Sequence, residues 1–227
     1  MHPDHHDDRP AAAFIAEELA KIPARYSPIA HLSATVGICL AVLLLSVSMI
    51  DAFGWREAAV IPAAFLLANL VEWIAHRELL HKERFGFRVL YQQHTPRHHV
   101  MYREESMAVA SRREWYFVLM PAKGVFGIAL AGAPVALALG WLMGADAAWT
   151  FMGVVGFYAG SYEVMHLIYH LPHGHAARGT EIIRKLSRHH ARHHDPRVMM
   201  TKNLNVTFPI FDWIFGTIAP KHHSTEP

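Results

Sequence analysis

Four long apolar segments occupy most of the chain, and each is long enough to cross a lipid bilayer as a helix. They cover residues 29–50, 58–80, 115–145 and 147–171. A membrane-spanning helix needs about 20 predominantly apolar residues. Short polar links at 51–57 and 144–147 join the first segment to the second and the third to the fourth. This pattern predicts an all-α integral membrane protein of four transmembrane helices in two hairpins.

Individual residues refine this prediction. Pro121 and Pro134 lie inside the third segment, where they predict kinks. The fourth segment carries Glu163 in its second half, and a polar side chain in a membrane helix is expected to face the interior of the bundle. Small residues let membrane helices approach closely. Close packing is therefore predicted at Gly153, Gly156 and Gly160.

Lysine and arginine predict the orientation of these helices. The two long polar regions, 76–114 and 172–227, contain most of the Lys and Arg residues, whereas the short links contribute only Arg56. Because cytoplasmic loops are enriched in these residues, both long polar regions and both termini are expected in the cytoplasm. We expect a single domain over 1–227 with a core at about 30–218. Residues 1–28 are expected to be interfacial or mobile, and 219–227 mobile.

Composition excludes several classes of protein. The chain is 52% hydrophobic and only 18% charged, and its formal net charge is +2. No basic stripe interleaved with aromatic residues is present, so a nucleic-acid partner is not expected. Cys39 is the single cysteine, which excludes a disulfide framework, a zinc ribbon and an iron–sulfur ligand set. The acidic, histidine-rich start of the chain is unlike a signal peptide.

The chain contains 19 histidines, and most of them fall in four short motifs. The motifs are HRELLH (76–81), HTPRHH (94–99), HLIYH (166–170) and HHARHH (189–194). In the predicted topology, all four lie at the cytoplasmic ends of the spans or in the cytoplasmic regions. This convergence predicts a histidine-rich metal site in a helical cap on the cytoplasmic face. His31 is expected to be interfacial, and the terminal His2, His5, His6, His222 and His223 are given no role.

Spacing within the motifs indicates which side chains share a face. His166 and His170 are four residues apart and share one face of a helix. His76 and His81 are five apart, which is about 140° around an ideal α-helix. Either the helix loosens there or these two histidines serve different metals. Pro96 is suited to the first position of a helix, with Thr95 as its N-cap.

The motif HHARHH requires a choice between neighbouring histidines. Ile182, Leu186, His190 and His194 are spaced by four and form one helical stripe, with His193 on the same side. His189 lies off that stripe. We therefore expect His190, His193 and His194 to bind metal and His189 to lie outside the ligand shell.

Ten imidazoles are too many for one metal ion and suit two. Neutral imidazole binds zinc, copper, iron and nickel, so the ligand type alone does not name the metal. The candidate ligands are His76, His81, His94, His98, His99, His166, His170, His190, His193 and His194. Side chains expected to orient these ligands are Glu72, Glu163, Asp195, His173 and His189. A substrate channel is expected along Phe157, Tyr158, Tyr162 and Met165, although such an aromatic stripe also suits ordinary packing.

These motifs resemble the fatty acid hydroxylase superfamily, which includes sterol desaturases and sphingolipid acyl-chain hydroxylases. The matching spacings are His76-x4-His81, His94-x3-His98-His99, His166-x3-His170 and His190-x2-His193-His194. The segment NVTFPIFDWIFGT, residues 205–217, is similar to the closing motif of that family. The resemblance covers about residues 30–218. One departure is the three-residue spacer in HTPRHH, where several members have two residues.

The resemblance implies a non-haem di-iron centre held by the ten histidines, with molecular oxygen as co-substrate; a purified sample could contain zinc instead. It implies hydroxylation of a C–H bond of a lipid, most readily a fatty-acyl chain. Electrons would come from a separate ferredoxin, rubredoxin or cytochrome with its reductase. Two alternatives stay open: a desaturase or oxidase acting on a sterol, carotenoid or other isoprenoid lipid, and a membrane zinc or metal-handling protein. The oligomeric state is not indicated.

Overall fold

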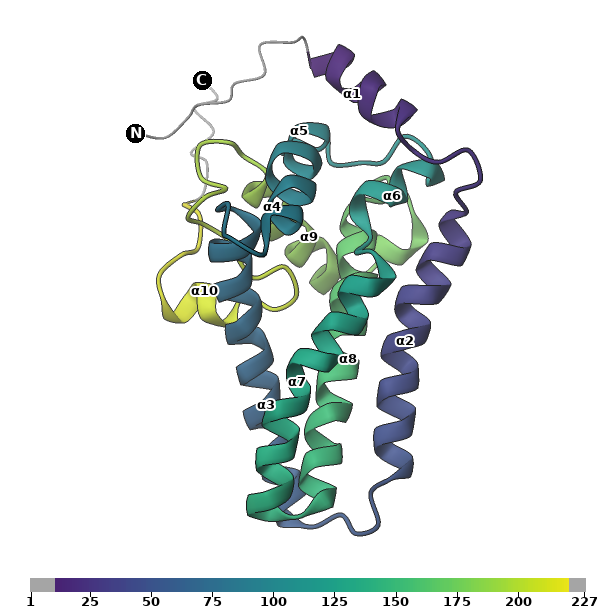
Figure 1. The fold of residues 1–227 in the computed structure, drawn as a ribbon. Coiled ribbons are helices and arrows are strands. Elements are labelled where there is room, and N and C mark those ends of the chain that lie inside the picture. Colours follow the sequence, from purple (N-terminus) through teal and green to yellow (C-terminus); the bar gives the residue numbers. More distant parts are fainter. Residues whose placement is uncertain (1–10, 221–227) are drawn as a thin grey trace.

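The computed structural model describes residues 11–220, which form helices and connecting loops without a strand. Long helices stand side by side as a bundle, and shorter helices form a cap at one end of it (Figure 1). The long helices are α2 (Pro28–Ser48), α3 (Trp55–Ala75), α7 (Ala122–Met143) and α8 (Ala145–Tyr169). The predicted all-helical fold is therefore confirmed. The terminal histidines, with residues 1–10 and 221–227 of the ends expected to be interfacial or mobile, lie outside the described residues.

Within residues 11–220, three helical stretches are long and apolar enough to cross a membrane. They are Pro28–Ser48, Trp55–Leu80 and Arg112–Met143. Helix α8 is also long, at 25 residues, but its second half contains Glu163 and His166. It packs against α2, α3 and α7, so its polar residues are covered by the other long helices. The fourth span stays a prediction from the sequence.

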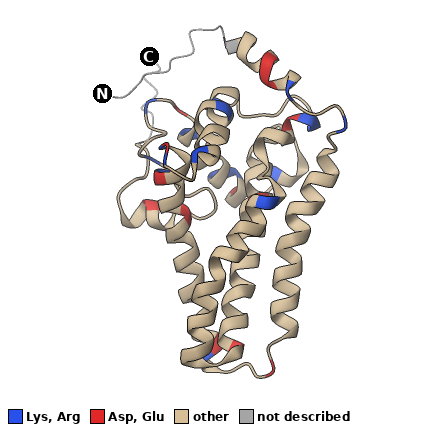
Figure 2. Cartoon of the chain, viewed as in Figure 1, with Lys and Arg blue, Asp and Glu red and all other residues tan. Residues whose placement is uncertain are grey.

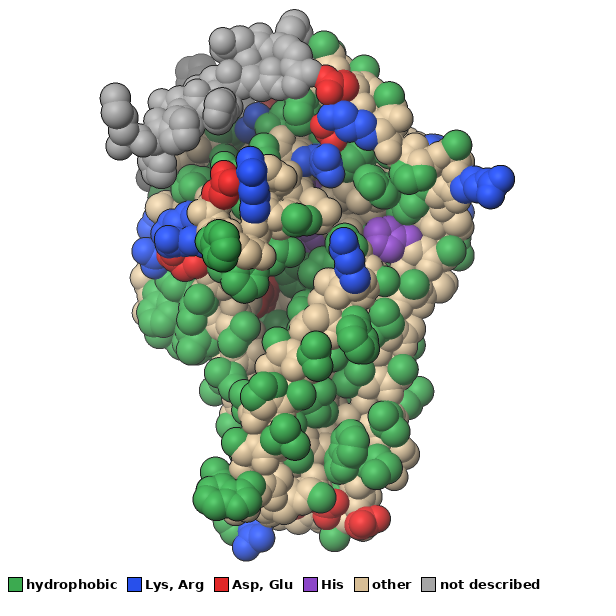
Figure 3. All heavy atoms as spheres, in the orientation of Figure 1, with side chains coloured by type: hydrophobic (Ala, Val, Ile, Leu, Met, Phe, Trp, Pro, Cys, Tyr) green, Lys and Arg blue, Asp and Glu red, His purple; other side chains and the backbone are tan. Residues whose placement is uncertain are grey.

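The outer surface of the bundle is apolar. Leu44, Leu130 and Leu137 are among its exposed side chains, and Leu137 is 75% exposed. Figure 3 shows this hydrophobic surface along the length of the bundle. Lys and Arg residues gather in the cap, with few charged residues at the opposite end (Figure 2). An apolar surface between two polar ends is the distribution that a lipid bilayer requires.

Glycine lets α2 and α8 come into close contact. A Cβ atom added at Gly156 would lie 2.8 Å from the Cys39 carbonyl oxygen, closer than real side chains allow. Cβ atoms added at Gly153 and Gly160 would lie 3.4 Å from Ser46 and 3.2 Å from Cys39. The predicted close packing of these glycines is confirmed. It brings the end of α8 that carries His166 and His170 firmly against the bundle.

The third apolar segment is interrupted, which corrects the single kinked helix expected over 115–145. After α6 (Trp115–Val118), the chain becomes extended at Leu119 and restarts as a helix only at Ala122. Pro121 explains the break, because the residue before a proline avoids the helical conformation. Helix α7 then continues past Pro134 to Met143.

The cap is assembled from short helices whose apolar sides meet above the bundle. They are α1 (Ala11–Ala20), η1 (His76–Leu80), α4 (Arg88–Gln93), η2 (His94–His98), α5 (His99–Met101), η3 (Arg112–Glu114), η4 (Ala176–Arg178), α9 (Glu181–His193) and α10 (Ile210–Ile214). Phe14, Ile15 and Leu19 of α1 pack on a core that includes Met101 and Tyr102. Helix α1 therefore covers the cap.

Candidate metal centre

Two π-helical turns bring histidines five residues apart onto one face. In η1 the His81 N–H donates to the His76 carbonyl at 3.1 Å, and in η2 the His99 N–H donates to the His94 carbonyl. A π turn is wider than an α turn and often occurs at functional sites. The first alternative for His76 and His81 is thus correct: the helix loosens, and both histidines join one group. The expected N-cap at Thr95 is wrong, because η2 continues from α4 through Thr95 and Pro96.

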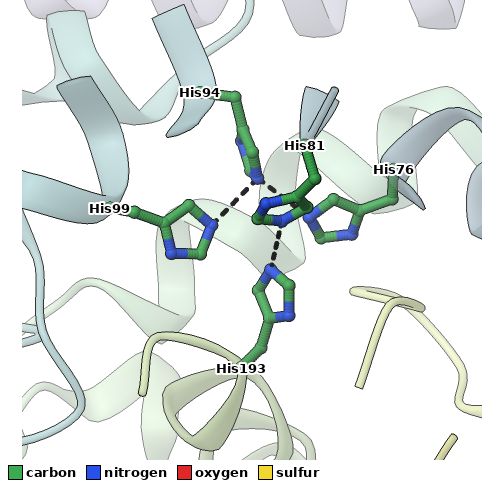
Figure 4. A group of neighbouring side chains, drawn as sticks. All are labelled: His76, His81, His94, His99 and His193. Atoms are coloured by element: carbon green, nitrogen blue, oxygen red, sulfur yellow. Dashed lines mark hydrogen bonds between the residues drawn. The ribbon is translucent and has the colours of Figure 1, made fainter. Parts of the chain in front are cut away.

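The first histidine group unites three of the sequence motifs. It consists of His76, His81, His94, His99 and His193, whose ring nitrogens lie within 4.8 Å of one another. All five side chains are buried. Figure 4 shows their rings pointing toward a common centre. The Nε2 atoms of His76 and His94 are 2.8 Å apart, and those of His94 and His99 are 3.0 Å apart.

The second histidine group lies next to the first. It consists of His98, His166, His170 and His190, all buried, with ligand atoms within 4.8 Å of one another. The Nε2 atoms of His98 and His166 are 3.3 Å apart, as are those of His170 and His190. The tenth predicted ligand, His194, is outside both groups but close to them. Its ring stacks on His99 with centroids 4.3 Å apart, and its Nε2 lies 3.1 Å from that of His190.

Five of these ten histidines donate from the ring nitrogen Nδ1 to a backbone carbonyl oxygen. The pairs are His76 with Leu204, His98 with Phe117, His170 with Met107, His193 with Lys202 and His194 with Tyr102. A carbonyl oxygen only accepts, so each Nδ1 must carry the proton. In a neutral imidazole, Nε2 then holds a lone pair, and these Nε2 atoms point at other histidines. This is the tautomer that metal binding through Nε2 requires.

Some of these lone pairs face each other directly. The Thr95 hydroxyl donates to the Leu80 carbonyl at 2.7 Å and accepts from His81 Nδ1 at 3.1 Å. His81 therefore also has a bare Nε2, which lies 3.0 Å from the bare Nε2 of His193. Two lone pairs at that distance repel each other. A metal cation between them would replace this repulsion with two coordinate bonds.

Near neutral pH, these histidines do not take up a second proton that would lie between the facing nitrogen atoms. Burial lowers the pKa of His98 to about 4. Burial first, and the neighbouring imidazoles second, hold the pKa of His94, His99 and His193 well below the ordinary histidine value. Neutral imidazole is the form that binds metal. The donor set and its protonation therefore fit metal ions, and the histidine groups can bind them.

A buried carboxylate, Glu72, fixes the segment that supports the first group. It lies one turn before His76 on α3 and accepts hydrogen bonds from the Val206 N–H at 2.6 Å and the Thr207 N–H at 3.0 Å. Tyr158 donates to the same carboxylate. The segment that begins at Leu204 is thereby held where its carbonyl meets His76. Sequence reasoning placed Glu72 near the ligands but missed Thr207.

A second buried carboxylate, Asp212 of α10, holds the same segment through the two preceding residues. It accepts from the Leu204 N–H at 2.9 Å, the Asn205 N–H at 2.8 Å and the Thr217 hydroxyl at 2.6 Å. His189 Nε2 also lies 3.1 Å from it. Burial alone would raise the pKa of Asp212, but these hydrogen bonds outweigh it and hold the pKa below its usual range. His189 is in neither histidine group.

The other residues expected to orient ligands lie farther from the histidine groups or have other partners. Glu163 is buried three residues before His166 and accepts from the Met120 N–H at 3.2 Å. Asp195 forms an ion pair with Arg197 at 2.7 Å. His173 lies in an exposed loop.

A cavity of about 650 Å³ leads from the surface to both histidine groups. Its lining includes His94 from the first group and His98 and His166 from the second. Figure 3 shows histidine side chains on this face, where the cap meets the bundle. Tyr162 is the one residue of the expected channel that lines this cavity.

The remaining residues of the expected channel lie elsewhere. Phe157 is 51% exposed on the outside of α8. Tyr158 is buried and hydrogen-bonded to Glu72, and Met165 packs near Tyr169. Sequence reasoning missed the wall formed by residues 116–124, because the interruption before α7 that creates it was not anticipated.

The fold and the site together define a helical protein with membrane-length apolar helices and a buried polyhistidine centre able to bind metal. A model of the family described as fatty acid hydroxylase matches residues 61–217. That match covers more than half of the chain, which therefore belongs to the fatty acid hydroxylase family.

One solved structure has a similar fold. It is described as full-length Scs7p with only the hydroxylase domain visible, and it is 18% identical with a TM-score of 0.54. The similarity covers 85% of this chain and 64% of the Scs7p chain, so this chain spans less than two thirds of that protein. A search of curated proteins found no match.

Proposed function

We propose that this protein is a membrane-bound di-iron oxygenase that hydroxylates a C–H bond of a lipid, most readily in a fatty-acyl chain. One observation carries the proposal. Two adjacent groups of buried, neutral imidazoles, with lone pairs directed at each other, lie beside an apolar-walled cavity that is lined by His94 of the first group and by His98 and His166 of the second. Membership of a hydroxylase family supports oxidation of a lipid over storage or transport of the metal.

In this proposal the ten histidines hold two iron ions, and the bound irons supply the activation of molecular oxygen. The first group holds one ion, the second group holds the other, and His194 lies near both. The chain itself fixes the tautomers through the carbonyl oxygens of residues such as Leu204, Lys202 and Phe117. Its cavity holds the lipid chain against His94, His98 and His166 and shields it from water.

The same proposal sets the protein in a membrane with α8 as a fourth span. Contacts with α2, α3 and α7 support this arrangement, since they remove the polar residues of α8 from lipid. The Lys and Arg residues of the cap support a cytoplasmic active site (Figure 2). We propose that a soluble ferredoxin, rubredoxin or cytochrome docks on this basic face and delivers electrons.

Metal analysis and lipid mass spectrometry test the proposal together. Protein loaded anaerobically with iron should contain two ions per chain, and an expressing host should accumulate a lipid whose mass has increased by one oxygen atom. Loss of two hydrogens without added oxygen would indicate desaturation instead. A His98→Ala variant should give neither product, while His173→Ala, in the exposed loop, serves as the matched control. Protein that binds no iron and leaves host lipids unchanged would refute the proposal.

A further inference from the structure

The mouth of the cavity carries positively charged side chains without acidic ones. Its lining contains Arg25, Arg97 and Lys123 but no Asp or Glu. Arg97 is already paired, because its guanidinium lies 2.7 Å from Glu18 of α1. Arg25 and Lys123 are exposed, and neither forms an ion pair among the described residues. Two cationic side chains therefore remain available at the mouth.

The positions of these two cations make one entrance. Arg25 belongs to the link before α2, and Lys123 belongs to the first turn of α7. These two segments are joined near the cavity, because His31 Nε2 donates to the Met120 carbonyl oxygen at 2.9 Å. No side chain caps the start of α7, so its first N–H groups add to the positive potential.

The cavity changes character from its mouth to its inner end. Its lining includes exposed Arg25 and Lys123, buried His94, His98 and His166, and the apolar side chains Leu80, Leu90, Val118 and Leu119. An apolar tunnel with a cationic mouth matches an amphiphile that has a hydrocarbon chain and an anionic headgroup. A neutral lipid would form no ion pair with either cation, and a cationic lipid would be repelled.

We propose that the substrate is a single-chain or acyl lipid with an anionic headgroup, either a carboxylate or a phosphate, bound between Arg25 and Lys123. The headgroup stays at the cavity mouth, and the chain extends inward to His94, His98 and His166. This inference rests on the proposed function, since it names the substrate class of the same site. The distance between headgroup and metal centre then selects which carbon of the chain is oxidised.

Equilibrium binding tests the headgroup without turnover. The full chain, iron-loaded and kept anaerobic in nanodiscs of zwitterionic phospholipid, is titrated with four probes that share a twelve-carbon chain. The probes are dodecanoate, dodecyl phosphate, dodecan-1-ol and dodecyltrimethylammonium. At least one anionic probe should bind about tenfold more tightly than the alcohol, and the tighter anion identifies the headgroup chemistry. Equal affinity for the alcohol, or tighter binding of the cationic probe, would overturn the proposal.

Substitutions test whether the two cations at the mouth cause the preference for anionic probes. Lys123→Gln and Arg25→Gln should each weaken binding of the anionic probe about two- to fivefold, as expected for partly exposed ion pairs. Neither change should affect the alcohol. Lys185→Gln removes an exposed cation on α9 that does not line the cavity, and it should leave all four affinities unchanged. Equal weakening by Lys185→Gln would show a general surface charge effect and overturn the assignment.

The two proposals can fail separately. Selective binding of anions by protein that takes up no iron would keep the headgroup assignment and remove the di-iron function. A hydroxylated host lipid together with equal binding of the anionic and neutral probes would keep the function and remove the headgroup assignment.

Discussion

The two histidine groups contain the same kind of ligand but depend on different parts of the chain for their orientation. In the first group, His76 and His193 donate to the carbonyl oxygens of Leu204 and Lys202, which belong to the C-terminal segment. In the second group, His98 and His170 donate to the carbonyls of Phe117 and Met107, which lie before α7. The two adjacent groups are therefore oriented by backbone carbonyls from separate segments of the chain.

This difference predicts that the two groups can be perturbed one at a time. The C-terminal segment that orients the first group is itself fixed by two buried carboxylates, because Asp212 accepts the N–H groups of residues 204 and 205 and Glu72 accepts those of residues 206 and 207. Near the second group, the buried carboxylate of Glu163 accepts one backbone N–H, from Met120, whereas Glu72 and Asp212 each accept two in the first group. We therefore expect substitutions of side chains outside the groups to weaken metal binding more in the first group than in the second. The second group should respond mainly to loss of its own histidines.

The largest effect is expected from His190→Ala. This change removes one imidazole from the second group, so that group should lose its iron while the first group keeps its own. The metal content should fall from two ions to about one, with loss of oxygenation. Iron analysis and lipid mass spectrometry measure both outcomes.

The neighbouring residue provides the matched control. His189 contacts Asp212 and belongs to neither group, so His189→Ala should keep both ions and measurable activity. It should weaken the first group by at most about 10- to 100-fold in affinity. Loss of metal in His189→Ala with full occupancy in His190→Ala would show that the register of α9 is assigned wrongly.

Asp212→Asn should act on the first group alone. The carboxylate accepts the Leu204 and Asn205 N–H groups, and an amide offers only one oxygen in its place. The displaced segment would move the carbonyl that orients His76, so iron affinity of the first group should fall about 10- to 100-fold. Competitive chelator titration should show one weakened site and one unchanged site.

A carboxylate at the other end of the bundle is the control for Asp212. Asp146 likewise accepts two backbone N–H groups, from Asp51 at 3.0 Å and Ala52 at 3.1 Å. Asp146→Asn should leave both iron affinities unchanged. If Asp212→Asn weakened both sites equally, the independence of the two supports would be refuted.

The sequence predicts much of this arrangement because histidine spacing is a local property. The stripe through His190 and His194 and the pair His166 and His170 follow directly from helical periodicity. Nine of the ten predicted histidines do fall into two groups, and the long apolar helices are where the hydrophobic pattern places them, apart from the break before α7. Helical periodicity within the motifs, together with the order of the apolar segments, is enough to bring the motifs to one end of the bundle.

The remaining features depend on contacts between distant segments, which periodicity does not record. The only sign of the π turns at His76 and His94 in the sequence is a spacing of five between histidines. For His76 and His81, that spacing fitted either a loosened helix or ligands of two different metals. Asp212 was visible within an apolar motif, but its partners Leu204 and Asn205 are fixed only by tertiary folding. The cavity likewise exists because Pro121 interrupts a segment that looks like one continuous helix.

The smallest effect is expected from Thr95→Val, which tests a support made by a side chain. The Thr95 hydroxyl accepts from His81 Nδ1 and donates to the Leu80 carbonyl. Valine has nearly the same volume but no hydroxyl, so the His81 ring would lose its acceptor and the Leu80 carbonyl would lose its donor.

Only one of the five ligands in the first group depends on Thr95, and His76 and His193 keep their carbonyl partners. Iron affinity of the first group should therefore fall less than in Asp212→Asn, by about three- to tenfold. The second group should be unchanged. Thr95→Ser, which restores the hydroxyl, should recover the affinity, and Thr201→Val, at an exposed threonine, should have no effect. Full affinity in Thr95→Val would mean that the carbonyl-bonded histidines alone determine how tightly the first group binds iron.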